Sequence, residues 1–83
     1  MLIRQINLDD HGRPEKVTAE LSQHEALYLA SILGKQNGID SEKVMPGGAA
    51  ISSELYNSLT GELFNRYWSG GALEALMEHS DAT

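Results

Sequence analysis

The absence of cysteine from a chain of only 83 residues is the feature that most restricts its fold. A domain of this size buries only about 60 to 65% of the surface that its unfolded chain exposes, so its core is small. Without cysteine, neither a disulfide framework nor a thiolate metal site can add stability. We therefore predict one small domain over residues 1–79 and a flexible tail over residues 80–83. Self-association into a homodimer is expected because it would add to a small core.

Two segments near the N-terminus alternate between apolar and polar residues, as β-strands do. One face of each segment is apolar, carrying Leu2, Ile6 and Leu8 in the first segment and Val17, Ala19 and Leu21 in the second. Between them, Gly12 and Pro14 mark a turn. The two strands are predicted to form an antiparallel hairpin. Because a two-stranded hairpin is marginal alone, either the helices lie over its apolar face or a second copy extends the sheet, and we expect the helices to cover it.

The remainder of the chain has helical periodicity, interrupted by a connection over residues 37–50. Ser22 and Glu25 have the spacing of a capping box, which predicts a helix from there to about Asn37. A second helix is expected from residues 50–53 to residues 67–68, and a short third helix over residues 72–79. The predicted fold is α+β, with an N-terminal two-stranded β-hairpin followed by two main α-helices and a short C-terminal helix.

Phe64 and Trp68 are the residues of the second helix that most need an explanation. The predicted core face of that helix is already filled by Ile51, Leu55, Tyr56, Leu59, Leu63 and Tyr67. The favoured interpretation is that the third helix covers the two aromatic side chains with Leu73, Leu76 and Met77. In the alternative, Phe64 and Trp68 are exposed and form a partner-binding surface. That surface would include Asn57 and Gly61, with Tyr28 on the first helix as a further candidate contact.

The charge of the chain argues against two classes of partner. Twelve acidic and six basic residues give a net charge of −6. Nucleic acids and anionic membranes are both bound through clusters of Lys and Arg, so neither is an expected partner. The first residues lack the apolar core of a signal peptide, and no apolar run approaches the roughly 20 residues that cross a bilayer. A cytoplasmic protein is expected.

The residue types that carry chemistry are present, but their spacing does not indicate a catalytic, metal or cofactor site. Residues 9–11 (Asp-Asp-His) are interpreted as a solvated turn in preference to a metal site. His24 and His79 are interpreted as surface residues, without a nucleophile or carboxylate oriented toward them. Residues 46–48 (Pro-Gly-Gly) could form an anion-binding turn, but they lack the Lys-Ser/Thr pair of a phosphate loop. We therefore expect no enzymatic activity.

Three segments together carry a resemblance to a class of proteins: residues 17–21 (VTAEL), residues 22–27 (SQHEAL) and residues 54–59 (ELYNSL). With these features the chain resembles the small acidic accessory proteins encoded by phages of actinobacteria. The resemblance implies a protein in a bacterial cytoplasm, without enzymatic activity, that binds a host protein and alters its function.

A second resemblance gives the alternative function. A strand followed by two helices, the latter opened by residues 51–55 (ISSEL), is similar to a ribbon-helix-helix repressor. That family reads DNA with outward side chains of paired strands, which here are Lys16, Thr18 and Glu20. One lysine offset by one glutamate is poorly suited to reading phosphates or bases. The connection over residues 37–48 is also longer than that family's turn between helices.

Overall fold

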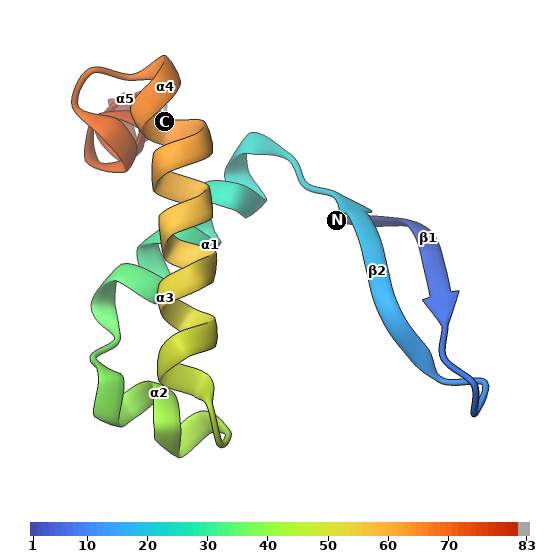
Figure 1. Cartoon of the computed structure of the whole chain (residues 1–83). Helices are drawn as coiled ribbons and strands as arrows, with labels where there is room; N and C mark the ends of the chain where they lie inside the picture. Colours follow the sequence, from blue (N-terminus) through green and yellow to red (C-terminus); the bar gives the residue numbers. More distant parts are fainter. Residues whose placement is uncertain (82–83) are drawn as a thin grey trace.

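The computed structural model describes residues 1–81 and confirms the α+β fold with its N-terminal hairpin (Figure 1). The hairpin consists of β1 (Leu2–Leu8) and β2 (Pro14–Glu20). The helical body consists of α1 (Gln23–Lys35), α2 (Gly38–Val44), α3 (Gly48–Leu59), the π-helical segment η1 (Thr60–Phe64), α4 (Asn65–Tyr67) and α5 (Gly71–Asp81). The last helix includes two residues of the expected tail, while residues 82–83 lie outside the described residues.

The predicted strands pair in antiparallel order, but an irregularity in β1 changes which residues share a face. Ile3 pairs with Ala19 and Gln5 with Thr18, so Arg4 is an extra residue that β2 does not match. A one-residue shift of this kind moves side chains to the opposite face. Ile3 therefore takes the place that the alternation predicted for Leu2.

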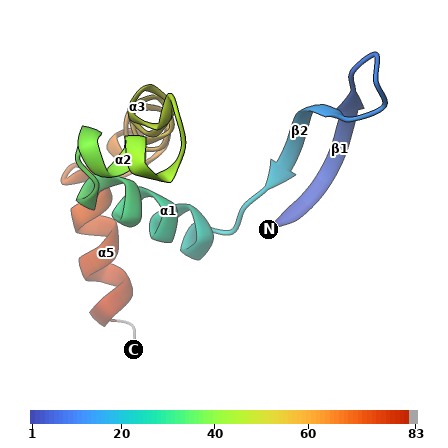
Figure 2. The same cartoon turned by 90° about the horizontal axis from the view of Figure 1, so that it is seen from below.

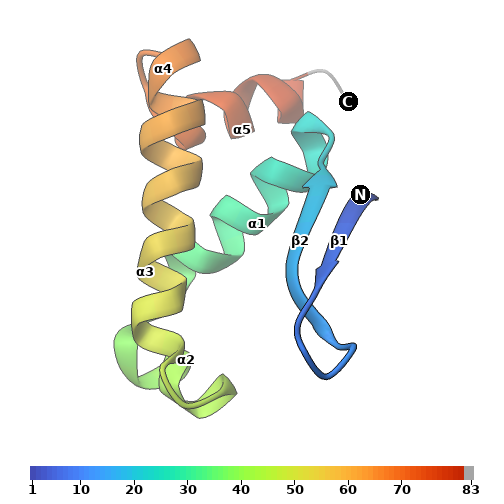
Figure 3. The ribbon, with the colours of Figure 1, turned by 45° about the vertical axis from the view of Figure 1, so that its right-hand side comes forward.

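The hairpin does not pack under the helices, which corrects the predicted arrangement. It projects from the helical body beside the N-terminal end of α1, as Figures 1 and 3 show from two directions. Seen from below, it stands clear of α2, α3 and α5 (Figure 2). The two strands contact each other extensively, and neither makes more than marginal contact with a helix. Only Leu21 and Ser22 separate β2 from α1, so this short connection fixes where the hairpin leaves the body.

The start of α1 confirms the predicted capping box. The Ser22 hydroxyl accepts a hydrogen bond from the backbone N–H of Glu25 at 3.1 Å, and the Glu25 carboxylate accepts one from the backbone N–H of Ser22 at 2.9 Å. These two bonds satisfy amides that the first helical turn otherwise leaves without partners. The cap fixes the residue at which strand geometry changes to helix geometry.

The connection predicted over residues 37–50 instead contains the short helix α2. Asn37 caps it by accepting a hydrogen bond from the backbone N–H of Asp40 at 2.8 Å. The helix packs on the start of α3, where buried Ser41 lies against Gly48. A Cβ atom at Gly48 would collide with the backbone oxygen of Ser41, so glycine allows this close approach.

The second predicted helix runs continuously through α3, η1 and α4 to Tyr67, and it begins two residues earlier than expected, at Gly48. Its π-helical turn places an extra residue between successive turns. The residues after this turn are therefore rotated relative to an ideal α-helix. Phe64 reaches the core side, whereas Tyr67, which the ideal period placed in the core, is 74% exposed.

The core of the helical body is centred on Phe64, which is 0% exposed. The other buried core residues are Ala26, Leu27 and Ala30 of α1 and Ala75 of α5. A positive φ angle of 68° at Gly71 lets the chain turn sharply after α4, so that α5 returns over the core. The favoured prediction that the third helix covers Phe64 is confirmed. The covering residues are small, however, and Leu73, Leu76 and Met77 remain exposed.

Substitution of Phe64 tests this core. Phe64→Ala is expected to lower the free energy of unfolding by about 3 to 5 kcal/mol, because it leaves a cavity between three helices. Tyr67→Ala is the matched control, since this exposed aromatic residue on the same helix should change stability by less than about 1 kcal/mol. Urea denaturation followed by circular dichroism measures both. Equal effects of the two substitutions would contradict the position of Phe64.

Candidate interaction surface

The predicted aromatic patch at Phe64 and Trp68 is not an exposed surface. Phe64 is fully buried under α5, and the ring of Trp68 lies 5.5 Å from it, centroid to centroid. Trp68 is half-buried, and its indole Nε1–H donates a hydrogen bond to the Glu78 carboxylate of α5 at 2.6 Å. The alternative interpretation as a partner contact is wrong for Phe64, because α5 folds back over it. Trp68 keeps part of its surface exposed, in a hollow that Leu63 and Tyr67 also line.

The other three predicted contact residues are exposed, but they do not lie in one patch. Asn57 on α3 and Gly61 on η1 are exposed, but the aromatic side chains predicted beside them are buried or half-buried. Tyr28 on α1 is 68% exposed, and its side chain borders two hollows. Of these three residues, Tyr28 is the one that lines a hollow in the described chain.

That larger surface begins on the hairpin. We define the apolar hairpin face as the residues that the register places on one side of it: Ile3, Ile6, Leu8, Val17 and Ala19. Ile6 and Val17 pair directly, and their side chains are 50% and 54% exposed. Large apolar side chains in such numbers are normally covered by another element. Here no helix of the described chain covers them.

The opposite side of the hairpin is mainly polar, and several of its side chains form hydrogen bonds with one another. The guanidinium of Arg4 donates two hydrogen bonds to the Glu20 carboxylate, at 2.8 and 3.0 Å. The side-chain amide of Gln5 donates to that of Asn7 at 2.8 Å. Side chains engaged with each other in this way suit a face that stays in water. The hairpin is therefore amphipathic, with its apolar side unpartnered in this chain.

A hollow of about 450 Å³ lies where the hairpin joins α1. Its lining residues are Met1, Leu21, His24, Glu25, Tyr28 and Leu29. Met1 immediately precedes β1, and Leu21 immediately follows β2. We call the apolar hairpin face and this hollow together the contact surface.

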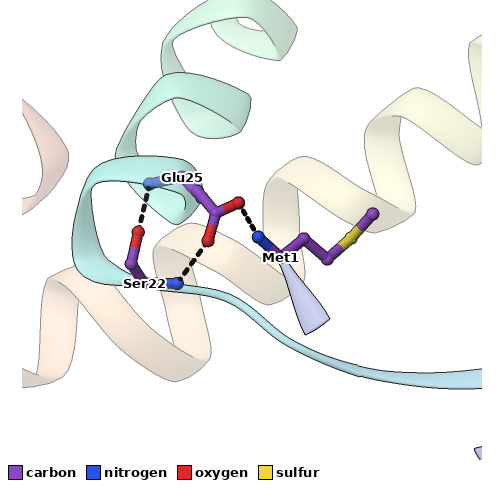
Figure 4. A network of polar contacts seen from close by, with 3 residues as sticks. All are labelled: Met1, Ser22 and Glu25. Atoms are coloured by element: carbon purple, nitrogen blue, oxygen red, sulfur yellow. Dashed lines mark hydrogen bonds and ion pairs between the residues drawn. The ribbon is translucent and has the colours of Figure 1, made fainter. Parts of the chain in front are cut away.

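Glu25 connects the N-terminus of the chain to the start of α1 at one end of this surface (Figure 4). Its carboxylate accepts hydrogen bonds from the ammonium group of Met1 and from the backbone N–H of Ser22. The ammonium contact, followed by the Ser22 amide, lowers the pKa of Glu25 from 4.5 to about 2. One side chain therefore caps α1 and also ties the start of β1 to that helix.

The hairpin also presents backbone groups. Because the sheet has two strands, each strand has one outer edge without a strand neighbour in the described chain. Unpaired edges of this kind can accept a further strand from another chain. The irregularity at Arg4 and the proline at the start of β2 limit how long such pairing could be.

The structure also brings together two histidines that were predicted as separate surface residues. The ring centroids of His24 on α1 and His79 on α5 lie 4.0 Å apart in an edge-to-face arrangement. Their proximity follows from the return of α5, which was predicted, but its contact with this part of α1 was not. In the described part of the chain, no group of three or more His, Cys, Asp or Glu side chains is placed to hold a metal ion.

The predicted turn between the strands is present at residues 10–13. Asp9 organises it, because its carboxylate accepts hydrogen bonds from the backbone N–H groups of His11 and Arg13 at 2.9 and 3.0 Å. Gly12 takes a positive φ angle of 76° within the turn.

None of the helices described for residues 1–81 is both long and apolar enough to span a membrane.

The pKa of Glu25 gives a direct test of the tie between β1 and α1. A lowered pKa means that the charged contact stabilises the fold above pH 4.5 and is lost as the pH falls through about 2. A ¹³C NMR titration of the Glu25 carboxyl carbon should give a midpoint near 2. Acetylation of the Met1 amine, which removes the ammonium, should raise the midpoint. Identical midpoints near 4.5 in both forms would show that the contact is absent.

The sequence and structure were also compared with known proteins. No protein-family model, curated protein or solved structure matches the chain. The contact surface, with its exposed apolar hairpin face, is therefore the basis on which a function is proposed.

Proposed function

We propose that the chain is a non-enzymatic cytoplasmic protein that acts by binding another protein through the contact surface. The observation that supports this proposal is the amphipathic hairpin, whose apolar side projects into solvent while its polar side is internally hydrogen-bonded. Burying such side chains stabilises a complex by about 25 cal/mol per Å² of apolar area. A projecting hairpin can insert this area into a groove or against a sheet of its partner.

The contact surface has the composition expected of a protein interface. Its centre consists of aliphatic residues of the hairpin, while Tyr28 and His24 at its base can combine apolar contact with a polar group. Tyr28 retains the role of contact residue that the sequence indicated. The resemblance to accessory proteins of actinobacterial phages suggests a bacterial host protein as the partner.

The alternative of a ribbon-helix-helix-like DNA-binding regulator receives less support. The outward residues that would read DNA, Lys16, Thr18 and Glu20, lie on the polar side of the hairpin. Arg4 also lies there, but its charge is paired with Glu20. One unpaired lysine and a net charge of −6 give little attraction for a phosphate backbone.

A pull-down from bacterial lysate with two neighbouring substitutions tests the proposal. Val17→Asp places a charge on the apolar hairpin face, and Thr18→Asp places the same charge on the polar face of the same strand. We expect Val17→Asp to reduce capture of the partner at least tenfold, because a carboxylate would have to be buried in the interface. Thr18→Asp should retain capture. Mass spectrometry identifies and quantifies the captured protein.

Two results would contradict the proposal. Equal capture by both variants would show that the apolar hairpin face is not the contact. Tight, sequence-selective DNA binding in a low-salt mobility-shift assay would instead favour the regulator.

A further inference from the structure

The chain exposes far more surface than a compact protein of its size. Its accessible surface is 6468 Å². A compact monomer of 9.1 kDa is expected to expose about 4,900 Å², so the excess is about 1,600 Å². The radius of gyration is 14.8 Å, against about 12 Å expected for a compact domain of this length. The projecting hairpin accounts for this expanded shape (Figure 3).

The hairpin also lacks the support that such an element needs. A two-stranded hairpin is at best marginally stable in water, and it becomes stable when helices or further strands cover it. Here the described helices leave its apolar face exposed, and the pairing is regular only from Gln5 to Asn7, with register shifts on either side. A partner that is present whenever the chain is present would meet this need, and another copy of the chain always has that property.

The size of the excess is sufficient for a stable dimer. A standard complex buries about 800 Å² on each partner, whereas obligate homodimers and permanent complexes of different chains bury about 2,000 to 5,000 Å² in total. Burial of about 1,000 Å² on each of two copies, less than the excess of about 1,600 Å², would reach the lower end of that range. In a twofold-symmetric dimer, each hairpin can cover the other copy in the same way.

Charge also permits this contact at the hairpin. Residues 1–21 hold three basic and four acidic residues, whereas residues 49–83 hold one basic and five acidic residues. Two acidic chains repel each other, and the repulsion is weakest where the local net charge is smallest. The hairpin is nearly neutral, so its apolar face is a favourable place for two copies to meet.

We propose that a second copy of this chain occupies the apolar hairpin face and forms a symmetric homodimer in which each hairpin packs against the other molecule. The proposal deepens the proposed function and rests on it, because it names the first partner of the same contact surface. Each hairpin then receives from the other copy the cover that its own helices do not provide. A bacterial protein that binds the same face would have to replace the second copy there.

Sedimentation velocity of the purified full chain between about 1 and 100 μM tests this proposal. The wild-type protein should sediment as a particle of twice 9.1 kDa, with dissociation only at the low end of the range. Val17→Asp should sediment as a monomer at every concentration, and Thr18→Asp should remain a dimer. Far-ultraviolet circular dichroism should show that both variants keep their helices, since the Phe64 core does not involve the hairpin.

Leu8→Asp gives a second variant on the other strand, because Leu8 lies on the same face two residues after Ile6, the residue that pairs with Val17. It should also weaken the dimer at least tenfold. A wild-type protein that is monomeric at 100 μM overturns the proposal, as does a dimer that both Val17→Asp and Leu8→Asp leave intact.

Failure of this proposal is distinguishable from failure of the proposed function. A monomeric protein that still captures a bacterial protein through Val17 keeps the function and excludes the homodimer. A dimer that Val17→Asp dissociates, but that captures no bacterial protein, supports the homodimer and removes the host-binding function.

Discussion

The packing of α5 over Phe64 determines how the rest of the structure is arranged. Phe64 lies at the centre of a core in which α1 contributes Ala26, Leu27 and Ala30 and α5 contributes Ala75. The small side chains let these helices approach closely, and burial of one aromatic ring supplies much of the available core. Because the helices complete this core among themselves, none of its residues comes from the hairpin. The apolar face of the hairpin is therefore outside this core and stays exposed.

The sequence predicted the elements that depend on local chemistry and missed those that depend on long-range geometry. Ser22 and Glu25 identified the start of α1 because a capping box involves only neighbouring residues. The hairpin and the three main helices follow in the same way from periodicity. The π-helical turn at Thr60–Phe64 was missed because it changes the period within an otherwise regular helix. Phe64 at its end is buried, although the regular period placed it off the core face. The extra residue at Arg4 was likewise missed, and because of it Ile3, not the predicted Leu2, lies on the apolar hairpin face.

The candidate site was predictable only in part. Tyr28 keeps its place on an exposed apolar surface, while Phe64 became the most buried large side chain of the body. The alternation that places Val17 and Ala19 on one face was visible in the sequence. Alternation indicates only that this face is apolar, not which element buries it. Whether its cover comes from the same chain depends on where the hairpin leaves the helical body, since the helices also keep exposed apolar residues such as Leu73 and Met77. Here the length of the connection at Leu21 and Ser22 and the closure of the core around Phe64 leave the hairpin outside.

The central claim is that the hairpin derives its stability from a second molecule and the helical body from its own core. Amide hydrogen exchange at two protein concentrations tests this claim most directly, because it reports protection separately for each element. The amides that pair β1 with β2 should be protected at about 100 μM and exchange much faster at about 1 μM, while protection in the Phe64 core, in α1 and α3, changes much less. Equal protection of the hairpin at both concentrations would contradict the account, since it would show that the isolated chain holds its own hairpin in place.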